Sequence, residues 1–210
     1  MKKRFTPAQL GILEKLNRRD LEHLVRLKEI IVPETWSDDE LAFSPLPMEW
    51  AWAAQFDKAI VVDQPAQVFG AYEQGRLVRW GPVSTGRKET PTPSGVYHLT
   101  WRAKSRVSTD NAQWLLKWYF NFINERGVSF HQFELPGTAM SHACVRLLER
   151  DAQWVYGWGQ QWTLSPDRRS VTATGTTVVV VGAYAHDQPA PWLTLDWWRQ
   201  PITLPDVPPS

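Results

Sequence analysis

The order of apolar and polar positions divides the chain into a helical start, a strand-rich middle and a tail rich in proline and tryptophan. Thr6-Pro7-Ala8-Gln9 is typical of a capped helix start, and leucines then recur at helical spacing through residues 10–16. Residues 20–27 predict a second short helix, and residues 29–33 predict a short strand that ends at a proline. The chain therefore begins with a small helical unit.

From residue 58 onward, short runs of β-branched residues replace the helical pattern. Residues 102–117 lack regular alternation, so we expect an irregular excursion from the sheet that covers a site. The pattern predicts a mainly β fold with one or two short helices. Strands are predicted at residues 59–63, 67–72, 76–80, 95–101, 118–123, 128–133 and 176–182, and a helix at residues 148–158.

These segments predict four parts. Residues 1–33 form a helical appendage, residues 34–57 a linker with prolines and tryptophans, residues 58–185 the main domain, and residues 186–210 a C-terminal strap that wraps it. Two short helices followed by Ile-Val-Pro resemble the later part of a LysM glycan-binding module, which would make the appendage a site for glycan. The alternative is a helical appendage that simply packs on the main domain.

Composition narrows the possible functions. With 210 residues, 23 Lys plus Arg and 22 Asp plus Glu, the net charge of +1 argues against nucleic-acid binding through bulk electrostatics. No apolar run is long enough to span a membrane. The basic start, Met1-Lys2-Lys3-Arg4, resembles that of a signal peptide, but no apolar segment follows it. Either the protein is not exported by that route, or the sequence is a processed form.

The candidate chemistry is concentrated in residues 130–147, which contain the single cysteine, Cys144, and two of the five histidines. His142 lies two positions before the thiol, so both side chains point to the same face of an extended segment. His131 lies on a predicted strand, from which a loop can bring it to the sulfur. We hypothesise a Cys/His nucleophilic site here, although this spacing alone more often indicates a buried, inert thiol. A three-ligand zinc site is also chemically possible, but we expect no cofactor. His98 is interpreted as structural.

Residues 58–183 resemble the L,D-transpeptidase catalytic domain (the YkuD family) of bacterial cell-wall enzymes. The opening strands, Ser84-Thr85-Gly86, the Thr-Pro element at residues 90–97 and Ser-His-Ala-Cys-Val-Arg-Leu at residues 141–147 match that family in order. The resemblance implies a β-sandwich or curled mixed sheet of the L,D-transpeptidase type. It also implies a role for each residue of the signature.

By this resemblance, Cys144 is the nucleophile and His131 the base, with His142 in a supporting role. The resemblance also implies that backbone N–H groups around Ala143 and Cys144 form the oxyanion hole. Ser141 would supply a supporting hydrogen bond, and Arg146 would hold substrate or shape the site.

The implied reaction is acyl transfer on peptidoglycan stem peptides in the periplasm or cell envelope, by a thiol of the kind that carbapenems acylate. The thiolate attacks the carbonyl after the L-centre of the diamino acid and releases the terminal D-amino acid. The thioester then passes to an amine, which gives a cross-link, D-amino acid exchange or protein attachment. Transfer to water would make the protein a carboxypeptidase, and an amidase would share the same thioester step. A wall-binding module with little or no activity, using a tryptophan-rich surface, is the alternative from another class.

Two departures from the family pattern bear on the rate of the reaction and not on its class. Ala143 stands where the family signature usually has glycine, so a positive φ at this position would cost about 1–2 kcal/mol. Such strain would shift the oxyanion N–H groups. The interval between His131 and Cys144 is also shorter than usual for the family, which implies a trimmed loop. Neither departure removes a reacting group.

Overall fold

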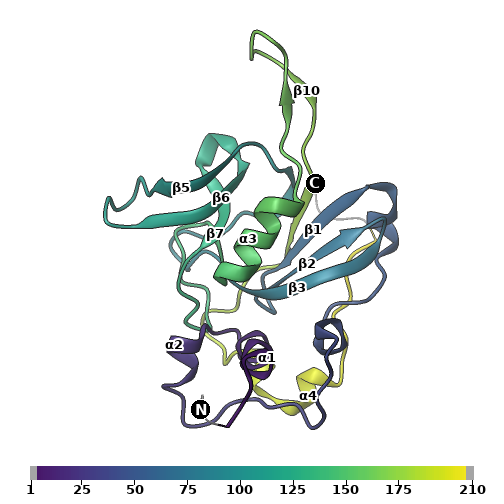
Figure 1. Ribbon diagram of the computed structural model, residues 1–210, viewed down its shortest axis with the longest axis vertical. Coiled ribbons are helices and arrows are strands. Elements are labelled where there is room, and N and C mark those ends of the chain that lie inside the picture. Colours follow the sequence, from purple (N-terminus) through teal and green to yellow (C-terminus); the bar gives the residue numbers. More distant parts are fainter. Residues whose placement is uncertain (1–3, 207–210) are drawn as a thin grey trace.

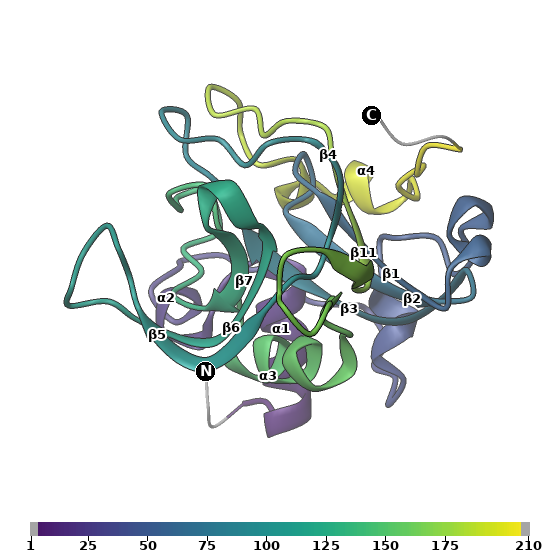
Figure 2. The same ribbon diagram turned by 90° about the horizontal axis from the view of Figure 1, so that it is seen from above.

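The computed structural model describes residues 4–206, and within them nine strands form one curled, mixed sheet (Figures 1 and 2). The strand order is β4-β11-β1-β2-β3-β8-β7-β6-β5, in which β1 runs parallel to β11 and β7 runs parallel to β8. The expected mainly β fold is confirmed. The strands are β1 (Lys58–Asp63), β2 (Val68–Glu73), β3 (Arg76–Ser84), β4 (Gly95–His98), β5 (Arg102–Val107), β6 (Leu115–Ile123), β7 (Val128–Gln132), β8 (Val145–Leu147) and β11 (Thr177–Val181), and a separate ribbon joins β9 (Thr163–Leu164) to β10 (Val171–Ala173).

Both faces of the central strands are buried, which explains their continuous apolar sequences. In β1, Ile60 and Val62 point into one core, whereas Ala59 and Val61 point into the other. Helix α3 (Glu149–Trp158) covers the first face and contributes Ala152 and Val155 to its core. The first core also contains residues of β7 and β8, so the strands that mount the candidate site are anchored in it.

The second face is covered by segments from both ends of the chain. Helix α1 (Pro7–Asn17) begins with the expected capping box, in which Thr6 and Gln9 exchange hydrogen bonds, and it buries Ile12 and Leu16 in the second core. The short helix α2 (Leu21–Leu24) follows and is capped by Asp20 as predicted. Helix α1 therefore packs directly on the sheet, and α2 packs against α1.

The linker and the tail meet on this same face. The linker contains the 3₁₀ turns η1 (Glu40–Phe43) and η2 (Ala51–Gln55), and the tail contains η4 (Pro191–Leu193) and helix α4 (Leu195–Trp198). Trp50 and Trp192 are buried, and the indole N–H of Trp50 donates to the carbonyl of Pro205 at 3.0 Å. These contacts hold the two segments together across 155 positions of sequence.

Two local predictions are wrong. Residues 102–117 form most of a β5–β6 hairpin instead of an irregular excursion, and a 3₁₀ turn, η3 (Asn124–Arg126), follows it. The alternation that would have predicted β5 is missing because much of this strand is exposed. The strand expected at residues 29–33 does not form; its backbone is irregular, and Ile31 is fixed by the side chain of Asn17. None of the helices in residues 4–206 combines the length and apolarity needed to cross a membrane.

Candidate active site

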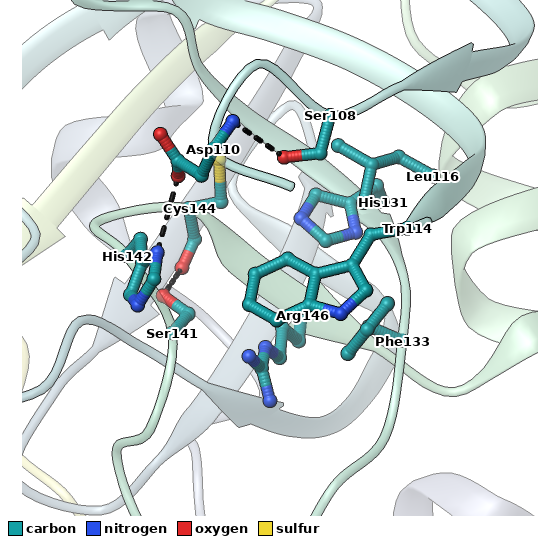
Figure 3. Close-up of a pocket in the computed structure, with 10 residues that line it drawn as sticks. All are labelled: Ser108, Asp110, Trp114, Leu116, His131, Phe133, Ser141, His142, Cys144 and Arg146. Carbon is teal, nitrogen blue, oxygen red and sulfur yellow. Dashed lines mark hydrogen bonds and ion pairs between the residues drawn. The ribbon is translucent and has the colours of Figure 1, made fainter. Parts of the chain in front are cut away.

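Five of the six predicted site residues line one pocket at the ends of β7 and β8, and the sixth, Ala143, lies in the adjoining turn (Figure 3). His131 projects from β7, and Arg146 projects from β8 beside it. Ser141, His142 and Cys144 come from the turn that leads into β8. The connection between β5 and β6 closes the pocket, which is lined by Ser108, Asp110, Trp114, Leu116, His131, Phe133, Ser141, His142, Cys144 and Arg146.

The turn at residues 141–144 is held by the loop after β3. The N–H of Ser141 donates to the carbonyl of Thr85 at 3.0 Å, and its own carbonyl accepts from the N–H of Arg87 at 2.9 Å. Gly86 is required between them, because an added Cβ would lie 2.1 Å from the carbonyl oxygen of Thr90. This contact explains the glycine of the Ser-Thr-Gly element.

The threonine-proline element fixes the other end of the same turn. Thr92 accepts a hydrogen bond from the N–H of Gly86 at 2.8 Å and donates its hydroxyl to the carbonyl of Ala143, also at 2.8 Å. The hydroxyl of Ser141 donates to the carbonyl of Cys144 within the turn. Because a peptide unit is planar, the fixed carbonyl of Ala143 sets the direction of the Cys144 N–H, and the fixed carbonyl of Cys144 sets that of the Val145 N–H.

Ala143 has φ 75°, in the left-handed region that favours glycine. The positive φ on which the predicted cost depended is therefore present. Among the described residues, the backbone N–H groups of Ala143 and Cys144 donate no hydrogen bond to another part of the chain. They are free to donate to a negatively charged oxygen that forms beside the sulfur.

His131 is held as a neutral imidazole with a defined tautomer. Its Nδ1 lies 3.0 Å from the carbonyl oxygen of Gln132, and because a carbonyl only accepts, Nδ1 carries the proton. The lone pair is then on Nε2. Burial, with a smaller effect of the nearby Arg146, lowers the pKa of His131 to about 4 against the opposing effect of the Gln132 hydrogen bond. His131 is therefore a proton acceptor at neutral pH.

The thiol of Cys144 is also uncharged at rest. Burial raises its pKa, and the carboxylate of Asp110 acts in the same direction, while Ser129 and Arg146 oppose this shift. The sulfur lies 3.5 Å from the hydroxyl of Ser129 and 3.8 Å from the carbonyl of Gly127. Among residues 4–206 no hydrogen bond joins it to His131. The pair thus rests as thiol and imidazole rather than as an ion pair.

His142 contacts the cover of the pocket. Its Nδ1 lies 3.2 Å from a carboxylate oxygen of Asp110, and its ring lies 5.5 Å from that of Trp114. The remaining cavity has a volume of about 30 Å³, enough for a water molecule and little more. In this arrangement His142 holds the β5–β6 connection closed over the thiol.

Arg146 brings a positive charge to the opposite wall. Its guanidinium lies 4.6 Å from the ring centre of Phe133, and burial lowers its pKa, partly offset by Glu134 and Cys144. An arginine remains protonated under these conditions, so this side of the pocket can receive a carboxylate.

The short connection between His131 and the turn is fixed by the N-terminal helices, which sequence reasoning missed. Asp20 accepts the N–H of Leu135 at 2.7 Å, and the backbone N–H of Asp20 donates to the carbonyl of Leu135 at 3.1 Å. The guanidinium of Arg19 donates to the carbonyl of Pro136. The sequence around Asp20 indicates only that it caps a helix. It does not indicate that the same carboxylate also binds Leu135, 115 positions later in the chain.

His98 lies on β4, pairs with Thr177 and does not line the pocket. Within residues 4–206 no group of three or more His, Cys, Asp or Glu side chains is arranged to hold a metal ion. The two histidines and the thiol near one another thus do not make a set of zinc ligands in this structure.

Comparison with known protein families finds one family model whose match includes this site. The model of the L,D-transpeptidase catalytic domain matches residues 57–181. No curated protein sequence matches the chain.

Several solved structures are similar in part. An L,D-transpeptidase from Stackebrandtia nassauensis is 23% identical, with 62% of this chain and 58% of that one covered and a TM-score of 0.47. An L,D-transpeptidase from Mycobacterium tuberculosis H37Rv is 22% identical, with 60% of this chain and 58% of that one covered and a TM-score of 0.47. One from Mycobacterium smegmatis is 17% identical, with 60% of this chain and 59% of that one covered and the same TM-score of 0.47. The chain spans less than two thirds of the length of these proteins.

Proposed function

Because the chain belongs to the L,D-transpeptidase catalytic domain family, we propose that it is a cysteine acyltransferase acting on peptidoglycan stem peptides. Its substrate lies outside the cytoplasmic membrane, so we place its action in the periplasm or cell envelope. The observation that carries the proposal is a thiol and a neutral imidazole in one pocket, next to the backbone N–H groups of Ala143 and Cys144, which have no hydrogen-bond partner within residues 4–206.

Acylation follows from this geometry. Nε2 of His131 takes the thiol proton, and the sulfur of Cys144 attacks the carbonyl carbon that follows the L-centre of the diamino acid. The carbonyl oxygen becomes negatively charged and accepts hydrogen bonds from the N–H groups of Ala143 and Cys144. Loss of one such donor typically costs about 2.7–4 kcal/mol of barrier. The C–N bond then breaks, and the leaving amine takes the proton from His131.

Transfer of the acyl group reverses these steps with a new nucleophile. An acceptor amine gives its proton to His131 and attacks the thioester, which releases the thiol of Cys144. The acceptor can be a stem peptide, a D-amino acid or a protein, while water would give a carboxypeptidase. Arg146 is suited to the carboxylate of the terminal D-residue, because it is the positive group of the pocket wall.

Substrate entry requires the β5–β6 connection to move. A cavity of about 30 Å³ does not admit a peptide, so residues 108–114 must withdraw and the contact between His142 and Asp110 must break. His142 then has the supporting role of a gate contact, released when substrate enters.

The test is turnover of a disaccharide-tetrapeptide, with products identified by mass spectrometry. The full chain should release the terminal D-amino acid and form a dimer, an exchanged peptide or a tripeptide. Cys144→Ala should abolish all of these products, and His131→Ala should lower the rate by at least about 10²-fold. A carbapenem should add covalently to the wild-type thiol and not to Cys144→Ala.

His98→Ala is the matched control, since it removes a histidine that does not line the pocket. It should retain turnover. If the folded wild type neither turns over the tetrapeptide nor reacts with a carbapenem, the proposal is wrong and a wall-binding role is favoured. Full activity of Cys144→Ala would rule out the thioester mechanism.

A further inference from the structure

Ser129 is a fully buried polar residue in the site that the proposed mechanism leaves without a role. It lies on β7 two positions before His131, so both side chains point to the same side of the strand. Phe130, between them, points into the core on the other side. Strand β7 therefore directs a base and a hydroxyl toward the same thiol.

The contact between Ser129 and the thiol is specific. Its Oγ lies 3.5 Å from the sulfur of Cys144, and among the described residues this is the hydrogen bond that its hydroxyl makes. The nearby carbonyl of Gly127, 3.8 Å from the sulfur, can only accept. That carbonyl also accepts the hydroxyl of Tyr119 at 3.0 Å. The thiol is thus held between an acceptor and a group that can donate.

Resting on the proposed acyl-transfer function, the geometry points to Ser129 as a positioning residue whose hydroxyl donates a hydrogen bond to the sulfur of Cys144 and stabilises it as a thiolate. In the resting state the thiol proton is directed to Gly127, and the serine hydroxyl faces the sulfur. When His131 removes the proton, the Gly127 carbonyl repels the negative sulfur, whereas the hydroxyl of Ser129 rotates freely to donate to it.

The electrostatics of the site explain why such a donor is needed. Burial lowers the pKa of His131 to about 4, so no imidazolium is present at rest to stabilise a thiolate. Burial also raises the pKa of Cys144, and Asp110 adds to that effect. The hydroxyl and the backbone N–H of Ser129 both lower the pKa of the thiol, and Arg146 helps more weakly. Ser129 is therefore the principal neutral group that favours ionisation.

The experiment measures the pH dependence of thiol alkylation by iodoacetamide, which needs no peptidoglycan substrate. A hydrogen bond to a charged group contributes enough to shift a pKa by about one unit or slightly more. Ser129→Ala should therefore raise the pKa of Cys144 by about one unit and slow alkylation about tenfold below that pKa. Ser129→Gly removes the same hydroxyl with a different effect on packing and should give the same shift, while thermal melting verifies folding.

Two further variants separate hydrogen bonding from structure. Ser129→Thr retains a hydroxyl and should restore most of the wild-type pH profile. Thr100→Val removes another buried hydroxyl, in the connection between β4 and β5, that donates to the side chain of Asn121 at 2.7 Å, and should leave the profile unchanged. Superimposable alkylation profiles for folded Ser129→Ala and the wild type would overturn the assignment.

The alkylation experiment tests Ser129 whether or not the proposed acyl-transfer function is correct. If the wild type fails to process stem peptide, the acyl-transfer proposal fails, yet the alkylation profiles still report whether Ser129 controls the thiol. If stem-peptide turnover is present and the pKa of Cys144 does not move in Ser129→Ala, only the role of Ser129 is wrong.

Discussion

Two regions of this protein bury ionisable side chains, and the contacts made by these side chains differ between the two regions. Beneath one face of the sheet, Lys15 and Arg18 of the N-terminal segment are fully buried. At the end of β7 and β8, His131 and Cys144 are enclosed beneath the β5–β6 connection. Arg18 remains charged at neutral pH, whereas His131 and Cys144 are neutral. The contacts around each pair explain the difference.

The buried cations are surrounded by acceptors and aromatic rings. Lys15 donates to the carboxylate of Glu40 and, at 2.9 Å, to the carbonyl of Trp80. Arg18 donates to the carbonyl of Ala66 at 3.0 Å, and its guanidinium lies within 5.2–5.7 Å of the ring centres of four tryptophans. Burial lowers the pKa of Arg18 to about 9, which still leaves it protonated. Such contacts hold a charge in place and stabilise the fold.

The thiol and the imidazole have few such contacts. His131 uses one nitrogen for the Gln132 carbonyl and leaves the other free, and the sulfur of Cys144 has only distant partners. A proton can therefore leave one group and reach the other when substrate arrives. Carbonyl, carboxylate and aromatic contacts hold the buried cations in place, whereas sparse hydrogen bonding around the thiol and the imidazole permits proton transfer.

The largest effect on stability should come from Arg18→Ala. This change opens a cavity among the tryptophans and removes the charge that faces Asp63, so we expect a loss of about 3–5 kcal/mol in the free energy of unfolding. Urea denaturation measures it. Arg26→Ala, which breaks an exposed pair with Glu22, is the control and should cost less than about 0.5 kcal/mol. Equal losses for both variants would contradict the structural role of the buried cation.

An intermediate effect should appear on acidification, through His131. Its folded pKa of about 4 lies below the ordinary histidine value of 6.5, so between these values the unfolded chain binds more protons. Stability is therefore present above about pH 6.5 and is lost as the pH falls toward 4, by on the order of 2–3 kcal/mol at about pH 4.5. Urea denaturation at pH 7 and pH 4.5 should show a smaller loss for His131→Gln than for the wild type. His98→Gln is the matched control, and a reduced acid sensitivity in that variant alone would refute the assignment.

The smallest effect should come from Ala143→Gly. Glycine removes a left-handed strain of about 1–2 kcal/mol but loses about 0.5–1 kcal/mol to chain entropy, so the net gain in stability should be at most about 1.5 kcal/mol. Thermal melting measures it, and the turnover rate should rise as the oxyanion N–H groups relax. Gln74→Gly, at φ 47° in the β2–β3 turn, should give a similar gain with no change in rate. A destabilised, slower Ala143→Gly would show that the alanine methyl group, which packs on the core, outweighs the strain.

Much of the catalytic region could be predicted from local sequence. The β-branched runs predicted β1, β2 and β11, because strands buried on both faces need apolar residues throughout. The capping residues Thr6 and Asp20 predicted where the first two helices begin. The Ser-His-Ala-Cys signature located the pocket, and the positive φ of Ala143 was foreseen as the condition for strain. Strand β5 was missed because its exposed positions impose no alternation.

The reacting groups are encoded locally in the chain: one thiol, a histidine on a strand, and a turn that supplies backbone N–H groups. Their protonation states and contacts arise from folding. Burial makes the pair neutral, β7 aims Ser129 at the sulfur, and Asp20 fixes the connection from a distance of 115 residues. The reason is physical: identities and local conformations are encoded along the chain, whereas solvation and long-range hydrogen bonds depend on which segments meet when it folds.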